Sequence, residues 1–391
     1  MTITTFRMYS LLCSGIMLCA VLLASCDIWQ SEEEERAIAE QQEKVRYENA
    51  MRDSTARADS LLQLRKRAAE SRFDSIPYRR IYVESAAALD SIKRVFSVGV
   101  SKDSAKVLAV LNRKEVRYIR VGDSLVLPSV ISKDLRAYSV FPQFYSAAAG
   151  IPKIIMISNR HQAYACYEYG ELVRYAACNT GTKGKPTFPG RYGVNWKQEM
   201  RISSLNEFWK LPFTVNFHQY AGNAFHQFDM PGRPVSHSCV RQFMDDAKWL
   251  FKWVKTAKLD TNKRFIPFTG TPVIILDMFE YKRKRFGPWL DIASNKQNVI
   301  SLPDKPMEVE EALIPMSQVP RDARGAVPNR KRYITAYDTL VARGVIDTTF
   351  KLRESIDYNK LRAAKLAAKK KPAASAAQPP VQPPAPKPAD G

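Results

Sequence analysis

The sequence predicts a mainly β protein, in which a small sandwich or barrel-like domain lies between a helical N-terminal segment and a disordered C-terminal tail. Short apolar runs bounded by turn residues crowd between 152 and 278, and only one helical stretch lies among them. Residues 31–72 contain neither Gly nor Pro and are rich in Glu, Arg and Ala, a composition that favours helix. Residues 361–391 are rich in Ala, Lys and Pro and cannot bury a core.

Each element expected in the β domain follows from its own pattern. The run 154–157 is continuously apolar, as in a buried strand, and 213–217 alternates apolar and polar side chains, as in a half-buried one. Residues 168–170 separate two strand-like runs and predict a hairpin turn. The expected strands are 154–157, 162–167, 172–177, 213–217, 223–228 and 271–276, and the expected helix is 245–255.

Composition limits the classes of function. With 391 residues the chain is long enough for two or three modules, and 45% apolar with 25% charged residues excludes disorder of the whole chain. Six cysteines, three of them in the first 26 residues, exclude a scaffold held by disulfides. The net charge of +21 favours an acidic partner such as nucleic acid, an anionic membrane surface or a cell-wall polymer.

The N-terminus predicts export. Arg7 precedes an apolar run from Tyr9 to Ala24, which is short for a membrane-spanning helix and typical of a signal peptide. The sequence Leu23-Ala24-Ser25-Cys26 resembles a bacterial lipobox, which implies a signal peptide at 1–25 and a lipidated Cys26. We therefore expect a membrane-anchored lipoprotein that faces the periplasm or the cell surface and binds no nucleic acid. The alternative is an ordinary signal peptide with an incidental cysteine.

The rest of the chain divides by composition. Residues 108–112 and 119–128 resemble the second half of a LysM repeat, in which a helix ends in Asn and a strand follows a Gly-Asp turn. That segment either binds glycan or is a structural remnant. The predicted parts are a helical tether at 26–78, a small mixed and possibly LysM-like module at 79–140, the β domain at 152–278, an extension at 279–360 and the tail at 361–391.

The residues capable of chemistry gather in one window. Three of the four histidines, His218, His226 and His237, lie within 20 residues, and Cys239 lies two residues after His237. A cysteine is a nucleophile only as the thiolate, so it needs a nearby base or cation. A strand that carries His226, followed by a turn through 231–234, would bring its imidazole to Cys239.

Neighbouring residues complete a candidate site. Arg241 lies two residues beyond Cys239, on the same face of an extended segment, where it could hold a substrate carboxylate. Backbone N–H groups near Cys239, together with the side chain of His237, are candidates for stabilising an oxyanion. Trp209 is a candidate shelf for substrate.

The string Ser236-His-Ser-Cys-Val-Arg241, with His226 upstream, resembles the signature of the YkuD-type L,D-transpeptidase catalytic domain. Residues 185–192, 211–226 and 270–275 are similar to further segments of that domain. The resemblance implies that Cys239 is the nucleophile, that His226 is its base, and that His237 and Arg241 shape the acyl site. It also implies that Ser236 orients its neighbours and that Ser238 stands where the family has Gly.

The family's activity is the formation of a cysteine acyl-enzyme on peptidoglycan stem peptides, which leads to cross-linking or to attachment to the cell wall. The resemblance therefore implies peptidoglycan as partner, anchoring through Cys26, and no cofactor or metal. Alternatives are a carboxypeptidase or hydrolase of the same fold, and a cell-wall-binding lipoprotein without turnover. A zinc site made of His218, His226, His237 and Cys239 has the right ligand types but no established zinc spacing. A purely structural His/Cys cluster is the remaining alternative.

Overall fold

The computed structural model describes residues 4–97, 99, 101–283, 287–297 and 299–370, and within them the side chains of residues 35–367. The chain divides into two compact units, Met1–Arg67 and Ala68–Gly391. Helix α1 (Thr4–Glu70) includes residues 4–25 of the predicted signal peptide and most of the predicted tether. Among the described residues, no helix is both long and apolar enough to cross a lipid bilayer.

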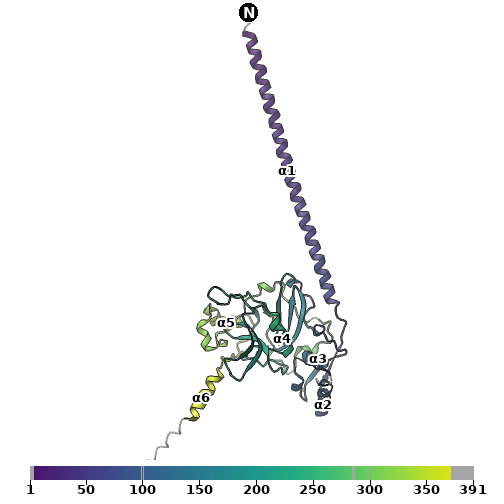
Figure 1. Cartoon of the computed structure of the whole chain (residues 1–391), viewed down its shortest axis with the longest axis vertical. Coiled ribbons are helices and arrows are strands. Elements are labelled where there is room, and N and C mark those ends of the chain that lie inside the picture. Colours follow the sequence, from purple (N-terminus) through teal and green to yellow (C-terminus); the bar gives the residue numbers. More distant parts are fainter. Residues whose placement is uncertain (1–3, 98, 100, 284–286, 298, 371–391) are drawn as a thin grey trace, which may run out of the picture. The chain divides into compact units, whose positions relative to one another are not determined.

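The predicted mainly β fold class is confirmed: nine strands of the second unit form one mixed sheet (Figure 1). The strand order is β6-β11-β3-β4-β5-β10-β9-β8-β7. The strands are β3 (Ile154–Ser158), β4 (Ala163–Glu168), β5 (Glu171–Asn179), β6 (Gly190–Gly193), β7 (Lys197–Ile202), β8 (Lys210–His218), β9 (Asn223–Gln227), β10 (Val240–Gln242) and β11 (Pro272–Ile275). The six predicted strands are confirmed, and the sequence did not predict β6, β7 or β10.

The central strands are buried on both faces. On β3, Ile155 and Ile157 belong to one hydrophobic cluster, whereas Ile154 and Met156 belong to another, as the period of two requires. The first cluster is completed by Leu250 of the predicted helix, α4 (Met244–Trp253), and by the C-terminal extension. The second is completed by the small module and residues 289–292. The sheet that carries the candidate site is therefore covered on each side by segments outside the β domain itself.

The small module has the order β1 (Tyr78–Tyr82), α2 (Ala86–Val95), α3 (Lys102–Asn112), β2 (Ser124–Pro128), with β1 and β2 antiparallel. Asn112, the helix-ending Asn noted in the sequence, is buried and fastens α3 to β2. Its side-chain amide donates to the carbonyl groups of Leu108 and Val126, each at 2.9 Å, and accepts from the Val126 N–H at 2.7 Å. The helix end and the strand are thereby held in one register.

The C-terminal extension is ordered around α5 (Arg330–Ala342) and α6 (Tyr358–Lys370). Elsewhere in the second unit the chain forms short 3-10 turns. They lie at 116–118, 135–138, 146–148, 288–291, 306–308, 316–318 and 321–326. Helix α6 continues to Lys370, so the first ten residues of the tail predicted at 361–391 are helical, because Leu361, Ala363, Ala364, Leu366 and their neighbours favour helix more than the Pro-rich sequence that follows. The rest of the predicted tail lies outside the described residues.

Candidate active site

Strand pairing brings the predicted nucleophile and base together. Strands β9 and β10 are parallel neighbours, with Arg241 opposite His226 and Val240 opposite Phe225. Cys239 directly precedes β10, so it lies beside the start of β9, where the backbone N–H of Ala224 hydrogen-bonds its sulfur. The predicted proximity of His226 and Cys239 therefore follows from two adjacent strands, and both side chains line one cavity.

The hydrogen bonding of His226 fixes which ring nitrogen can act as a base. Burial lowers the pKa of His226 to about 4, with a smaller contribution from Arg241, so the imidazole is neutral near pH 7. Its Nδ1 lies 2.9 Å from the backbone oxygen of Gln227, and a carbonyl oxygen only accepts. Nδ1 therefore carries the proton, and Nε2 holds the lone pair that could take a proton from a thiol.

Cys239 is half-buried and rests as a thiol. Burial raises the pKa of Cys239 above its ordinary value, and the Ala224 N–H and the cations of Arg241 and Arg201 oppose this rise. Its Sγ donates a weak hydrogen bond to the Gly222 carbonyl at 3.7 Å. The resting pair is thus a neutral thiol and a neutral imidazole.

Ser238 keeps the turn that a glycine would make before the nucleophile. Its φ is 79°, in the left-handed region that non-glycine residues rarely adopt. The carbonyl of Ser238 accepts a 3.0 Å hydrogen bond from Oγ1 of Thr187, which itself accepts from the Gly181 N–H at 3.0 Å. Thr187, part of the segment 185–192 singled out in the sequence, therefore holds the backbone next to Cys239.

Ser236 supports the same turn from the other side. Its hydroxyl donates to the carbonyl of Cys239. Its backbone N–H donates to the carbonyl of Thr180 at 3.1 Å, and its carbonyl accepts from the Thr182 N–H at 3.0 Å. Ser236 thus fixes the backbone next to Cys239.

Arg241 is held by the loop that follows β9. Its guanidinium lies 4.4 Å from the ring centroid of Phe228, and its Nη1 donates to the backbone oxygen of Asp229 at 3.2 Å. The carboxylate of Asp229 accepts in turn from Tyr118 Oη at 2.7 Å and pairs with Arg117 at 2.5 Å. The small module is thereby connected to the candidate site, a relationship that the sequence did not reveal.

His237 lies among aromatic rings. Its Nε2 is 3.1 Å from the hydroxyl of Tyr358, and its ring centroid lies 5.0 Å from that of Trp209. Burial lowers the pKa of His237, and the cations of Lys185, Arg241 and Arg353 lower it further. Tyr358 was missed at the level of sequence because it lies 119 positions beyond Cys239, in the extension, with no motif around it.

These residues share one cavity of about 970 Å³. All the predicted catalytic and acyl-site residues except Ser238 line it, as does Trp209. The charged side chains that line it are Arg201, Arg241, Arg321, Asp322, Glu354, Asp357 and Lys360. The other walls come from the β7–β8 hairpin and from the C-terminal extension. Arg321 and Lys360 pair with Glu354 and Asp322, so a peptide with carboxylate groups that enters this cleft would meet Arg201 and Arg241.

His218, Cys166 and Cys178 do not line this cavity. His218 accepts at Nδ1 from the Ala221 N–H at 3.1 Å and lies 3.2 Å from Tyr333 Oη at Nε2, so both ring nitrogens are engaged. No group of three His, Cys, Asp or Glu side chains is arranged for a metal ion anywhere in the part of the chain that the structure describes. Cys166 and Cys178 are buried free thiols. Cys26 lies in α1, and its side chain is outside the described residues.

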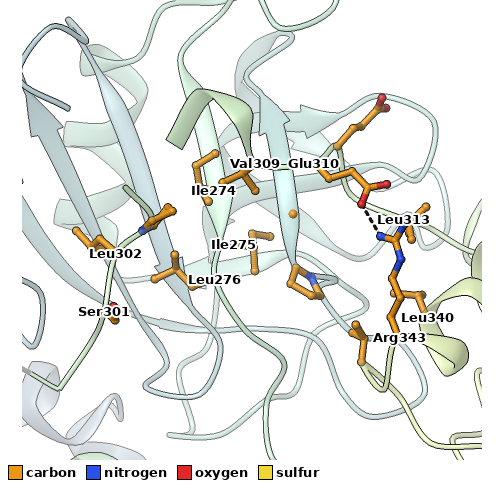
Figure 2. A pocket seen from close by; sticks show the side chains of 15 residues that line it. Ile274, Ile275, Leu276, Ser301, Leu302, Val309, Glu310, Leu313, Leu340 and Arg343 are labelled. Atoms are coloured by element: carbon orange, nitrogen blue, oxygen red, sulfur yellow. Dashed lines mark hydrogen bonds and ion pairs between the residues drawn. The ribbon is translucent and has the colours of Figure 1, made fainter. Parts of the chain in front are cut away.

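A second cavity, of about 550 Å³, is mainly apolar (Figure 2). Ile274, Ile275 and Leu276 line it from β11 and its end, and Glu310 pairs with Arg343 at its side. It contains no thiol, hydroxyl–imidazole pair or other nucleophilic arrangement among its lining residues. Of these two cavities, the first is the one lined by cysteine and histidine side chains.

Comparison with known proteins agrees with the motif. Residues 152–275 match the family model of the YkuD L,D-transpeptidase catalytic domain. Among curated proteins no match was found. Similar solved structures include an L,D-transpeptidase from Stackebrandtia nassauensis, at 18% identity and a TM-score of 0.30, over 50% of this chain and 78% of that one.

Two mycobacterial structures are also similar to this chain. L,D-transpeptidase 1 of Mycobacterium tuberculosis aligns at 18% identity and a TM-score of 0.24, and an L,D-transpeptidase of Mycobacterium smegmatis at 14% and 0.26. Each alignment covers 32% of this chain, and this chain spans only 61% and 58% of their lengths. The family-model match thus identifies residues 152–275, about a third of the chain, as a YkuD-type L,D-transpeptidase catalytic domain.

Proposed function

We propose that the protein is a peptidoglycan L,D-transpeptidase that acts through an acyl-enzyme on Cys239. The observation that carries this proposal is the hydrogen bond from His226 Nδ1 to the Gln227 carbonyl, which leaves Nε2 as the basic nitrogen in the cavity that also contains Cys239. A neutral imidazole beside a thiol supplies a general base that can activate a cysteine nucleophile.

The first half-reaction forms a thioester. As the sulfur of Cys239 attacks the carbonyl carbon of an L,D peptide bond, the thiol proton passes to Nε2 of His226. The carbon–nitrogen bond then breaks, and His226 returns the proton to the departing amine of the terminal D-residue. Backbone N–H groups near Cys239 and the ring of His237 would stabilise the oxyanion between these steps.

The second half-reaction consumes the thioester. An amine of a second stem attacks the acyl carbon and gives up a proton to His226, and the sulfur leaves and regains that proton. A new amide bond is the product, and the enzyme returns to its starting state. Neither half-reaction uses a cofactor.

The charge of the cleft supports an anionic peptide substrate. Arg201 and Arg241 lie on the catalytic-domain side of the cavity, whereas Arg321 and Lys360 on the extension side pair with Glu354 and Asp322. Stem peptides carry free carboxylates, which guanidinium groups bind well. The net charge of +21 agrees with an anionic polymer as partner.

Location outside the cytoplasm completes the proposal. The lipobox-like sequence at 23–26 supports lipidation of Cys26, and the helical segment after it would serve as a tether. Metabolic labelling with a fatty-acid analogue would mark the wild type and not Cys26→Ala. Labelling of both proteins would contradict this part of the proposal.

The catalytic proposal is tested by incubating the full chain, in detergent micelles, with muropeptides from digested peptidoglycan. Mass spectrometry should find cross-linked dimers, or loss of a terminal D-residue, with the wild type and not with Cys239→Ala. Loss of the D-residue without new cross-links would indicate a carboxypeptidase. Unchanged muropeptides with both proteins, together with binding to intact sacculi, would indicate a cell-wall-binding protein and contradict the proposal.

A further inference from the structure

Residues 353–362 of the C-terminal extension, here called the C-terminal arm, reach the candidate active site. Residues of this arm line the catalytic cavity together with 320–323. The arm contacts two parts of the catalytic domain: the segment around Lys185, and residues 203–209 between β7 and β8, here called the hairpin loop. These contacts place a segment from outside the catalytic domain beside His237.

Backbone and amide hydrogen bonds fasten the arm to the hairpin loop. The N–H of Tyr358 donates to the Leu205 carbonyl at 2.8 Å. The side chain of Asn359 accepts from the Glu207 N–H at 2.9 Å and donates to the Ser204 carbonyl at 3.3 Å. The hairpin loop and the arm therefore form one continuous wall of the cavity.

Arg362 and Lys185 secure the two ends of the arm. Arg362 pairs with Glu207 at 3.2 Å, and its guanidinium lies 4.3 Å from the ring centroid of Phe208. At the other end, the buried ammonium group of Lys185 donates to Ser355 Oγ at 2.8 Å, and the Arg353 N–H donates to the Gly184 carbonyl at 2.9 Å. With both ends attached, Tyr358 has little freedom to move relative to the β domain.

Tyr358 uses this fixed position to hold His237. Its hydroxyl lies 3.1 Å from Nε2 of His237, and its ring centroid lies 5.9 Å from that of the imidazole. On another side, the ring centroid of Trp209 lies 5.0 Å from that of the imidazole. Within the described residues, Nδ1 of His237 has no hydrogen-bond partner. Since the two rings and the hydroxyl fix the imidazole plane, Nδ1 also has a fixed direction.

We propose that Tyr358 is a positioning residue for acyl transfer, which holds His237 in the orientation needed by the acyl donor. This inference rests on the proposed transpeptidase activity. Without the hydroxyl, the imidazole could rotate and exchange tautomers, so fewer molecules would present the correct nitrogen at the moment of attack. The loss should appear mainly in kcat, because the proposed role of His237 is to stabilise the oxyanion, which exists only during attack.

The test compares Tyr358→Phe with Tyr337→Phe in the full chain. Tyr337 is a matched control, because its hydroxyl also makes one hydrogen bond, to the Phe350 carbonyl at 3.2 Å, and Phe350, unlike His237, does not line the catalytic cavity. With muropeptides as substrate, Tyr358→Phe should lower kcat about tenfold and change KM less than about threefold, whereas Tyr337→Phe should match the wild type. Equal kcat in all three proteins would overturn the proposal.

A readout independent of turnover separates this proposal from the proposed function. The chain has only four histidines, so the ring nitrogens of His237 can be assigned by ¹⁵N NMR. The wild type should show one neutral tautomer of His237, and Tyr358→Phe should show an averaged mixture, with no change in Tyr337→Phe. A single unchanged tautomer in Tyr358→Phe would refute the positioning role, even if the wild type proved inactive on muropeptides.

Discussion

The hydroxyl of Ser238 donates a 3.1 Å hydrogen bond to the side-chain oxygen of Asn223, at the start of the strand that carries His226. Ser238 has a φ of 79°, and Asn223 is buried. Ser238, which stands where the family has glycine, thus has a strained backbone, and the hydrogen bond of its side chain offsets that strain. The nucleophile turn and the base strand are joined by this bond.

Replacing Ser238 tests that compensation. Glycine relieves about 1 kcal/mol of left-handed strain and loses about 1 kcal/mol of hydrogen bonding, so Ser238→Gly should unfold in urea with nearly the wild-type free energy. Ser238→Val loses the hydrogen bond and adds a β-branched side chain at positive φ, so it should be destabilised by more than about 2 kcal/mol. A larger loss in Ser238→Gly than in Ser238→Val would contradict this compensation.

The reactivity of Cys239 should depend on pH as a buried thiol does. Because burial raises its pKa, alkylation by iodoacetamide should be slow at pH 7 and should still be accelerating at pH 9. The alkylation rate of Cys239→Ala is subtracted, because that variant keeps the buried thiols Cys166 and Cys178. A rate that reaches its plateau below pH 8 would show a preformed thiolate–imidazolium pair instead.

Acid should destabilise the fold before most carboxylates titrate. Burial lowers the pKa values of His161, His218 and His226 to about 4, below the ordinary 6.5. The unfolded chain therefore binds more protons than the folded one between those values, so stability falls as pH falls from about 6.5 towards 4. The melting temperature of Cys239→Ala should drop between pH 7 and pH 5. Replacement of His161 by Gln should reduce that dependence, and a melting temperature independent of pH would count against the buried neutral histidines.

The small module should depend on Asn112. Asn112→Ala removes the two hydrogen bonds that join α3 to Val126 of β2 and leaves both backbone polar groups of Val126 unpaired, which should cost about 2–4 kcal/mol in urea unfolding. The exposed Arg120 provides the control, because Arg120→Ala keeps the 2.8 Å hydrogen bond from its backbone N–H to the Asp123 carboxylate and should cost less than about 0.5 kcal/mol. Equal stability of the two variants would show that the amide does not fasten the helix to the strand.

Much of the fold could be predicted from the sequence because its central strands are strongly patterned. β3, β4 and β5 are apolar runs separated by turn residues, and all three were predicted within two residues of their bounds. β7 was missed because its side chains are mostly exposed and show no apolar alternation. β10 was missed because three residues are too few to show a period.

The candidate site was predictable where its residues are close in sequence. His226 and Cys239 are thirteen positions apart, and the parallel pairing of β9 with β10 makes them neighbours in space as well. Tyr358 and the Asp229–Tyr118 contact could not be predicted, because they depend on how the extension and the small module pack on the sheet. No local pattern encodes such long-range packing.

The central claim, acyl transfer through Cys239, is tested most directly by trapping the covalent intermediate. The full chain is mixed with a synthetic stem tetrapeptide, quenched in acid within seconds, digested and examined by mass spectrometry. We expect the peptide containing Cys239 to gain the mass of the tetrapeptide without its terminal D-residue, and Cys239→Ala to gain nothing. Product formed by Cys239→Ala at the wild-type rate, or the same adduct on another residue, would contradict acyl transfer through Cys239.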